Sequence, residues 1–296
     1  MVNENRYIHN ALKQARIKEK SYTLSGFSIS GLATYHLMQE LDFIVDLGEC
    51  PLNAVPIDHV FLTHAHGDHS RCLMRHHSLR KMTGIERDSV YYLPEEISEN
   101  ARAWIKAEAM FENVPEYKFR CPEIVPMRAN EKVTLAYRKD LVLEAFPIKH
   151  SIPGMGCTLY RFKKKLKDEY LGATPTELIE LQKNKVQITR EVFDPAITFM
   201  GDCKSESLLD NPQVFNSEVL VTECTFLDDG EEDMARQKSH SHLNDIVKIF
   251  NDLGEAIKCK TIVFNHFSMK YSEQHIMGTL EKKLPDFVKE RVKVLI

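Results

Sequence analysis

A dense group of potential metal ligands follows one short apolar segment. Residues 59–63 (HVFLT) are rich in large apolar side chains and predict a buried strand. The chain then continues as THAHGDHS, which carries His64, His66, Asp68 and His69. Imidazole and carboxylate ligands together suit zinc, manganese or iron better than calcium. A histidine-rich surface loop has a similar composition, but the position directly after an apolar strand favours a metal site.

The spacing within this motif separates the ligands into two pairs. Side chains alternate along an extended chain, so His64 and His66 are expected to face the same side. The chain then turns at Gly67, which lets Asp68 and His69 reach a second metal. A helix beginning near residue 70 would direct its N-terminus toward the site, where anions are favoured.

Three more ligand-type residues follow other apolar segments. His150 follows residues 141–149, Asp202 follows AITFMG, and His266 follows TIVFN. A single histidine after a strand is usually structural, but strand ends at one edge of a sheet converge on one cleft. We therefore expect one metal bound by His64, His66 and His150, a second bound by Asp68, His69 and His266, and Asp202 between them. Two metals about 3.5–4 Å apart can clamp a phosphodiester around a shared hydroxide.

Apolar runs alternate with helical patterns along the chain. Strands are expected at 41–46, 59–63, 89–93, 141–148, 196–200, 219–222 and 261–264, and helices at 95–111, 174–183, 242–253 and 272–284. This alternation predicts sheets covered by helices, and 296 residues with 43% hydrophobic content suffice for one large α/β domain. Trp104 is expected to pack in the core.

Charge is distributed unevenly. Residues 161–192 are polar and separate two motif-bearing strands, so we expect a surface excursion. Its start, RFKKKLK, and the cations among the first twenty residues are either phosphate-binding patches or solvated faces, and the sequence leaves both open. A net charge of −4 counts mildly against a large RNA footprint.

Several classes of protein are disfavoured. No apolar run approaches 18 residues, and the first twenty residues have no signal-peptide core, so no membrane partner and a cytoplasmic location are expected. The seven cysteines are scattered without C-x-x-C spacing, so we expect reduced thiols and no cysteine zinc site.

These motifs resemble those of a known family. The H-x-H-x-D-H pattern at His64 to His69 resembles the metallo-β-lactamase superfamily. Four later segments are similar to ribonuclease Z: FMGD at 199–202, TECTFLDD at 222–229, KSHSH at 238–242 and NHFSMKY at 265–271. DLGECP at 46–51 and residues 165–189 resemble its short, plant-type branch. The resemblance covers residues 22–296, which leaves residues 1–21 as an N-terminal extension.

The resemblance implies a fold and an activity. It implies a four-layer αββα sandwich and an endoribonuclease that removes 3′ trailers from precursor tRNA by metal-activated hydroxide attack, leaving 5′-phosphomonoesters. It also implies two divalent metals, Zn²⁺ before Mn²⁺ or Fe²⁺, and a homodimer, in the cytoplasm or in the nucleus of a eukaryote.

The resemblance also implies roles for three residues. Asp68 would be both a ligand and the general base, His240 would donate a proton to the leaving oxygen, and Glu223 would hydrogen-bond His240. Elementary chemistry supports these roles, because the departing 3′-hydroxyl needs a proton and a carboxylate keeps a histidine in the right tautomer. His242 is expected at a helix start or in contact with substrate.

The chain also departs from the family pattern. The arm that grips tRNA in the family is reduced here to residues 161–192 and lacks a Gly-Pro tip. Four lysines would replace it in part as substrate contacts: Lys163, Lys164, Lys165 and Lys167. Lys270 stands where the family often has arginine, and lysine meets a phosphate without a bidentate fork.

These departures keep two other functions in view. The first is a small-molecule hydrolase on the same dinuclear site, such as a cyclic-nucleotide or other phosphodiesterase, or a lactonase. The second is a non-enzymatic, metal-stabilised RNA-binding protein, which is disfavoured because every candidate ligand and catalytic residue is present.

Overall fold

Two seven-stranded sheets form the centre of the protein in the computed structural model, which describes residues 14–19 and 21–296. The first sheet has the order β1 (Ala15–Lys18), β2 (Thr23–Ile29), β3 (Ala33–Met38), β4 (Phe43–Val45), β5 (His59–Phe61), β6 (Val90–Pro94) and β7 (Glu123–Met127). The second has the order β14 (Val292–Val294), β13 (Thr261–Asn265), β12 (Val219–Glu223), β11 (Thr189–Phe199), β10 (Met155–Leu166), β9 (Arg138–Pro147) and β8 (Lys132–Leu135).

Both sheets are built in the same way. In each, the first four strands along the chain pair antiparallel and the last four pair parallel, with the fourth strand common to both sets. The parallel strands end at one edge, where their loops can meet. The chain is therefore a duplicated unit, with its N-terminal half in one sheet and its C-terminal half in the other.

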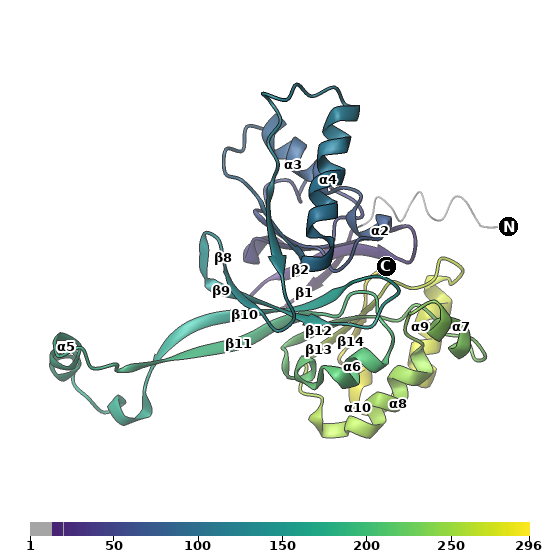
Figure 1. Ribbon diagram of the computed structural model, residues 1–296. Coiled ribbons are helices and arrows are strands. Elements are labelled where there is room, and N and C mark those ends of the chain that lie inside the picture. The colour runs from purple at the N-terminus through teal and green to yellow at the C-terminus, as the bar shows by residue number, and fades with distance from the viewer. Residues whose placement is uncertain (1–13, 20) are drawn as a thin grey trace.

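Helices cover the outer faces of the sheets (Figure 1). They are α2 (Gly67–Ser70), α3 (Leu73–Met82) and α4 (Glu95–Phe111) on the first half, and α6 (Glu206–Asp210), α7 (Glu232–Gln237), α8 (Leu243–Leu253), α9 (Glu273–Lys283) and α10 (Asp286–Lys289) on the second. Short 3-10 turns lie at Gln39–Leu41, Asp168–Tyr170, Pro212–Asn216 and Gly254–Ala256. The predicted four-layer αββα sandwich is confirmed.

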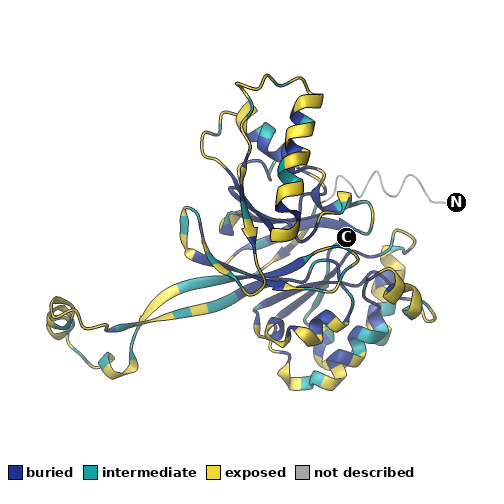
Figure 2. Ribbon diagram, in the orientation of Figure 1, coloured by how far each residue is buried: buried dark blue, intermediate teal, exposed yellow. Residues whose placement is uncertain are grey.

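Alternation along the strands builds three cores. In β4, Phe43 and Val45 pack between the sheets, whereas Ile44 faces the helices of the first half. This is the period of two expected of a strand buried on both faces. On α8, Ile246 and Phe250 recur at helical spacing and pack against the second sheet. Figure 2 shows that the sheets and the inner faces of the helices are buried.

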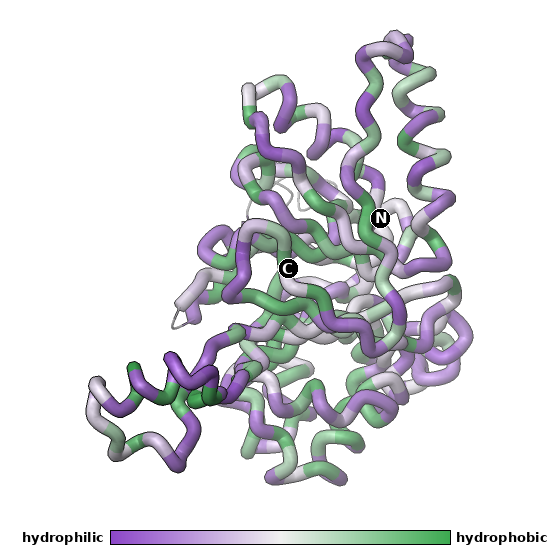
Figure 3. The backbone as a smooth tube through the Cα atoms, turned by 60° about the vertical axis from the view of Figure 1, so that its left-hand side comes forward, coloured by the Kyte–Doolittle hydropathy of each residue, from purple (hydrophilic) through white to green (hydrophobic). Residues whose placement is uncertain are grey.

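Residues 161–192 leave the body as an arm (Figure 1). Strands β10 and β11 continue beyond the sheet as a two-stranded ladder that pairs residues 162–166 with 189–193. The arm ends in α5 (Pro175–Lys183), which begins with a capping box: Thr174 Oγ1 accepts from Glu177 N at 3.4 Å, and Thr174 N donates to Glu177 Oε2 at 2.7 Å. No residue of α5 is buried. Hydrophilic residues predominate along the arm (Figure 3).

The N-terminal extension overlaps the described chain only in part. Residues 1–13 and 20 lie outside the described residues. Residues 15–18, which the sequence analysis placed in the extension, form β1 at the edge of the first sheet. The domain boundary at residue 22 stays a prediction. None of the helices in the described part of the chain is long and apolar enough to cross a membrane.

Candidate metal centre

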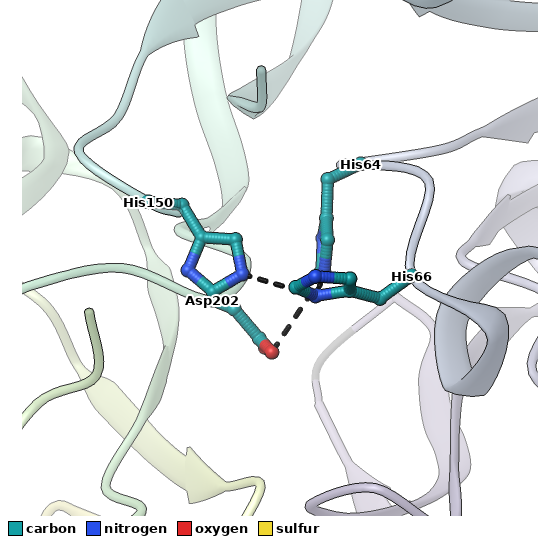
Figure 4. A group of neighbouring side chains, drawn as sticks. All are labelled: His64, His66, His150 and Asp202. Atoms are coloured by element: carbon teal, nitrogen blue, oxygen red, sulfur yellow. Dashed lines mark hydrogen bonds and ion pairs between the residues drawn. The ribbon is translucent and has the colours of Figure 1, made fainter. Parts of the chain in front are cut away.

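The loops that follow four strands bring all seven predicted ligands together. His64 to His69 follow β5, His150 follows β9, Asp202 follows β11 and His266 follows β13. The ligand atoms fall into two groups, within each of which they lie no more than 4.8 Å apart: His64, His66, His150 and Asp202, and then Asp68, His69 and His266. Figure 4 shows the first group, with His64 and His66 on one loop and His150 opposite.

Asp202 lies between the groups. Its Oδ2 atom is 3.8 Å from His64 Nε2 in the first group. The same atom is 3.3 Å from His69 Nε2 and 3.2 Å from His266 Nε2 in the second. One carboxylate oxygen within reach of both groups has the position expected of a bridging ligand.

Hydrogen bonds on the outer side of four imidazoles fix their tautomers. His64 Nδ1 lies 2.9 Å from Thr63 Oγ1, whose proton goes to Asp46. The Nδ1–H groups of the other three rings point at acceptors at 2.8–3.1 Å: Asp46 for His69, the Ser239 carbonyl for His150 and Thr225 Oγ1 for His266. An outward N–H leaves the Nε2 lone pair of each ring aimed at the centre.

This arrangement of lone pairs is complementary to cations. His69 Nε2 and His266 Nε2 lie 3.3 Å apart, and His66 Nδ1 lies 3.1 Å from His64 Nε2 and 3.2 Å from His150 Nε2. Converging lone pairs repel one another unless positive charge lies between them. The donor set of imidazoles and carboxylates therefore fits divalent transition metals.

The charge states of the groups agree with this fit. Burial lowers the pKa of His64, His66 and His150, which favours the neutral form that a ligand must have. Burial also lowers the pKa of His69, but Asp202 and Asp46 outweigh it and hold that pKa well above its usual value. The position between the carboxylates thus attracts positive charge.

Asp68 is held by the turn between β2 and β3. Its Oδ2 accepts a hydrogen bond from Gly31 N at 2.8 Å and lies 3.6 Å from His266 Nε2. Burial raises the pKa of Asp68, but the neighbouring His266 and His69 lower it by more. The net effect is that the pKa of this carboxyl lies below its usual range. Gly31 has φ of +73°, a conformation that suits glycine.

Two of these contacts were not predicted. Asp46 is 1% exposed and contacts both Thr63 and His69, so it orients one ligand from each group. Asp46 is the last residue of the apolar segment 41–46, and the predicted metal ligands likewise follow apolar segments. Nothing in the sequence indicated that Gly31 would contact Asp68.

His240 lies at the edge of the centre. A nitrogen of His240 lies within 4.8 Å of ligand atoms of Asp202 and His266. Its Nδ1 donates to Glu223 Oε1 at 3.0 Å, so the hydrogen bond implied by the family resemblance is present. Burial lowers the pKa of His240, but the charge of Glu223 outweighs it and raises the pKa to about 9. A ring nitrogen held protonated beside the metal ligands can supply a proton there.

His242 takes the first of its two predicted roles. It is the N-cap of α8, where its Nδ1 accepts from Asn244 N at 3.0 Å. Its Nε2 donates to the Asp228 carbonyl at 2.9 Å, and the side chain is fully buried. Its contacts are those of a helix-start residue, and it is not accessible to a substrate.

The lysines predicted to bind substrate are not gathered at the centre. Lys163, Lys164, Lys165 and Lys167 all lie on the arm, which Figure 1 shows projecting from the body. Lys163 pairs with Asp194, and Lys167 Nζ lies 3.9 Å from Glu169. Lys270 pairs with Glu231 and lies 4.8 Å from the centre of the Tyr271 ring. Their role in substrate binding stays a prediction.

Trp104 differs from its expected place in the core. It is 37% exposed and lines an apolar pocket of about 370 Å³ between α4 and the metal-binding loop. The helical positions explain the difference, because Ile105 and Ala109 of α4 are buried in the core of the first half, whereas Trp104 lines the pocket together with Ala65 and Gly67.

Comparison with known proteins identifies a matching family and several similar proteins. A family model described as a beta-lactamase superfamily domain matches residues 48–267. The tRNase Z TRZ1 of Arabidopsis thaliana is 30% identical over 286 residues, which are 96% of this chain and 98% of that protein. The chloroplastic tRNase Z TRZ2 of the same plant is 30% identical over 282 residues, 94% of this chain and 77% of that protein.

A solved structure agrees in fold. The short form of human tRNase Z superposes with a TM-score of 0.53 and 17% identity, covering 95% of this chain and 88% of that chain. At this level of identity the likeness concerns the arrangement of the sheets and helices.

Proposed function

The chain belongs to the β-lactamase superfamily and, within it, to the tRNase Z (ribonuclease Z) family, and from this premise we propose that it is a divalent-metal-dependent endoribonuclease that removes 3′ trailers from precursor tRNA. One observation carries the proposal beyond family membership. The shared carboxylate Asp202, the ligand His266 and the histidine His240 lie within 4.8 Å of one another. Phosphodiester hydrolysis needs a proton donor next to the charge-stabilising ions.

The residues divide the chemical work. When bound, two divalent cations would supply an activated water and stabilise charge on the phosphate oxygens. The first cation would be held by His64, His66 and His150, the second by Asp68, His69 and His266, and both by Asp202. Zinc is the ion we propose, because imidazole-rich sites with carboxylates suit it, with Mn²⁺ and Fe²⁺ as the alternatives.

His240 would complete the reaction by giving its Nε2 proton to the departing 3′-oxygen. Glu223 holds Nδ1–H and thereby directs Nε2 away from itself. Asp68, fixed by Gly31, would accept the proton of the attacking water. The products would be tRNA with a 3′-hydroxyl and a trailer with a 5′-phosphate.

A cleavage assay tests the proposal. Purified protein supplied with Zn²⁺ or Mn²⁺ is incubated with a precursor tRNA that carries a 3′ trailer, and the ends of both products are mapped. We expect one cut that leaves a 3′-hydroxyl and a 5′-phosphate. Failure to cut with either metal, in protein that retains bound metal, would refute the proposal.

The role of His240 can be tested separately with a substrate whose leaving group departs without a proton. His240→Ala should slow precursor cleavage by roughly 10²–10⁴-fold, the usual contribution of a general acid. Hydrolysis of bis(p-nitrophenyl) phosphate should fall far less, because nitrophenolate departs unprotonated. An equal loss for both substrates would contradict the proton-donor role.

A second function is favoured by the charge of the arm. Residues 168–183 carry Asp168, Glu169, Glu177 and Glu180 against Lys183, so the arm tip is acidic. Such a tip repels RNA, which favours a small-molecule hydrolase on the same dinuclear site, a phosphodiesterase or a lactonase. Turnover of small esters at rates indifferent to salt, without precursor cleavage, would identify that function.

The quaternary state and compartment are also proposals. We propose a homodimer located in the cytoplasm, or in the nucleus of a eukaryote. Light scattering coupled to size-exclusion chromatography tests the dimer, and fractionation of the source cells tests the location.

A further inference from the structure

A groove of about 940 Å³ adjoins the metal centre. It runs between the start of α4 and the loop that joins β9 to β10, residues 148–154. His150 is one of the residues that line it, and His150 Nε2 lies 3.2 Å from His66 Nδ1 in the first metal group. A chain bound at the metals can therefore continue directly into the groove.

Three cations from three separate segments line this groove: Arg128, Lys149 and Lys204. Two of them already pair with exposed carboxylates, Arg128 with Glu95 at 2.6 Å and Lys149 with Asp210 at 2.6 Å. Exposed ion pairs of this kind are weak and exchange partners readily. The Lys204 ammonium, in contrast, has no carboxylate within 4 Å anywhere in residues 14–19 and 21–296.

The backbone that carries Lys204 is fixed. Lys204 lies two residues after Asp202 and its N–H donates to the Lys149 carbonyl at 2.9 Å. Cys203 N, one residue earlier, donates to Glu223 Oε1 at 2.6 Å. The segment that carries Lys149 is also fixed, because Lys149 N donates to Ser207 Oγ at 2.8 Å. An unpaired cation thus stands on a rigid segment next to the bridging ligand.

We propose that this groove receives the RNA backbone beside the cleavage site, and that Lys204 contacts the phosphate adjacent to the scissile one. The proposal rests on the nuclease function proposed above. The groove is also lined by Glu95 and Glu96, but a groove that adjoins the metal ligands and carries an unneutralised ammonium suits a phosphodiester chain, which needs charge contacts without base reading. Lys149 joins the contact by exchanging Asp210 for phosphate.

This contact differs from any contact made by the arm. The arm projects away from the body of the protein (Figure 1), so the lysines along it would meet a different part of the RNA. Lys204 acts next to the reacting phosphate and sets the path of the strand there. It is a positioning residue for the substrate, and its loss should appear mainly in KM.

Kinetics on precursor tRNA test the inference. Lys204→Met keeps the aliphatic stem and removes the charge, Lys204→Arg keeps the charge, and Lys248→Met is the matched control. Lys248 is an exposed lysine of α8 on the outer face of the second sheet. Lys204→Met should lower kcat/KM by roughly five- to tenfold through KM, and should flatten the slope of log kcat/KM against log salt by about 0.7, the value for one single-strand phosphate. Lys204→Arg should restore both quantities, and Lys248→Met should change neither.

Trailer length locates the phosphate. If the Lys204→Met defect disappears on a precursor with a single-nucleotide trailer, the contacted phosphate lies in the trailer; if it persists, the phosphate lies on the tRNA side. Both results support the groove as a backbone path. Equal kcat/KM and equal salt slopes for Lys204→Met and Lys248→Met would overturn it while the nuclease function stands. A wild-type protein that cuts no precursor would instead remove the proposed function, and this inference with it.

Discussion

Glu223→Gln isolates the contribution of one buried charge to the centre. Glu223 ends β12, is 1% exposed and accepts hydrogen bonds from four donors: Cys203 N at 2.6 Å, His240 Nδ1 at 3.0 Å, Ser241 N at 3.1 Å and Thr225 Oγ1. Only a carboxylate can accept all four. The amide of glutamine has one oxygen, so its NH₂ group faces either Cys203 N–H or Ser241 N–H whichever way it turns.

The size of the effect follows from these contacts. A buried N–H left without an acceptor costs about 1–3 kcal/mol, so the free energy of unfolding should fall by that amount. The bond from His240 becomes one to a neutral group, and a charge-assisted hydrogen bond is worth about 1.5–3 kcal/mol. A hydrogen bond to a neutral group is worth about 0.5–1.5 kcal/mol, so the difference is about 1–1.5 kcal/mol. If that difference is expressed in the transition state, kcat for precursor tRNA falls by roughly 5–15-fold.

A matched variant separates catalysis from stability. Asp58→Asn also removes a buried carboxylate, here one paired with Arg80, but it lies on the first half of the chain outside the centre. Both variants should unfold at lower urea concentration, and only Glu223→Gln should lower kcat of the folded enzyme. In a His240→Ala background, Glu223→Gln should lower kcat no further, because Glu223 acts through His240. Equal kcat values for the two single variants would refute this reasoning.

Three further perturbations have defined outcomes. Asp202→Ala removes the shared carboxylate and should reduce the zinc retained after dialysis from two ions to one or none, as measured by elemental analysis; undiminished zinc would contradict the bridging position. Gly201→Ala should destabilise the fold by about 2–4 kcal/mol in urea titrations, because φ is +67° and a Cβ would lie 2.9 Å from Thr63 Cβ. Gly230→Ala, at φ of +88° with open space around it, should cost only about 1–2 kcal/mol. Equal losses of stability in the two variants would contradict the steric explanation. Burial lowers the folded-state pKa of His76 to about 4, so its contribution is full above pH 6.5 and is lost as pH falls toward 4. The stability of wild type relative to His76→Gln should therefore drop by about 2 kcal/mol between pH 7.5 and pH 5, and parallel pH profiles would contradict it.

Much of the fold could be predicted from the strands and helices whose patterns are local. The predicted helix 95–111 coincides with α4, and helices α8 and α9 begin and end within one residue of prediction. Their apolar positions recur at helical spacing, and α8 and α9 begin at the capping residues His242 and Ser272. The strands that precede the ligands were predicted because each contains a continuous apolar run, which is typical of a strand that is buried on both faces.

Strands β2 and β3 could not be predicted in the same way. They bury Ser28 and Thr34, whose hydroxyls bond each other at 3.1 Å, and His36, whose Nε2 lies 2.8 Å from Asn265 Nδ2. Polar residues inside a core become favourable only when distant segments supply their partners. The sequence does not show those partners.

The candidate centre shows the same division. Its ligands could be predicted because metal binding requires particular side chains at strand ends. Gly31 and Lys204 could not, because each acts through its position beside residues far along the chain, by a backbone N–H in one case and by an unpaired charge in the other.

The duplicated topology has a consequence for assembly. His64 and His66 come from the N-terminal half, whereas His150 and Asp202 come from the C-terminal half, and the second group is divided in the same manner. Neither fragment alone carries a complete coordination sphere. Bound cations would therefore cross-link the two halves of the chain. The affinity for the metal ions would then depend on how stably the two halves associate.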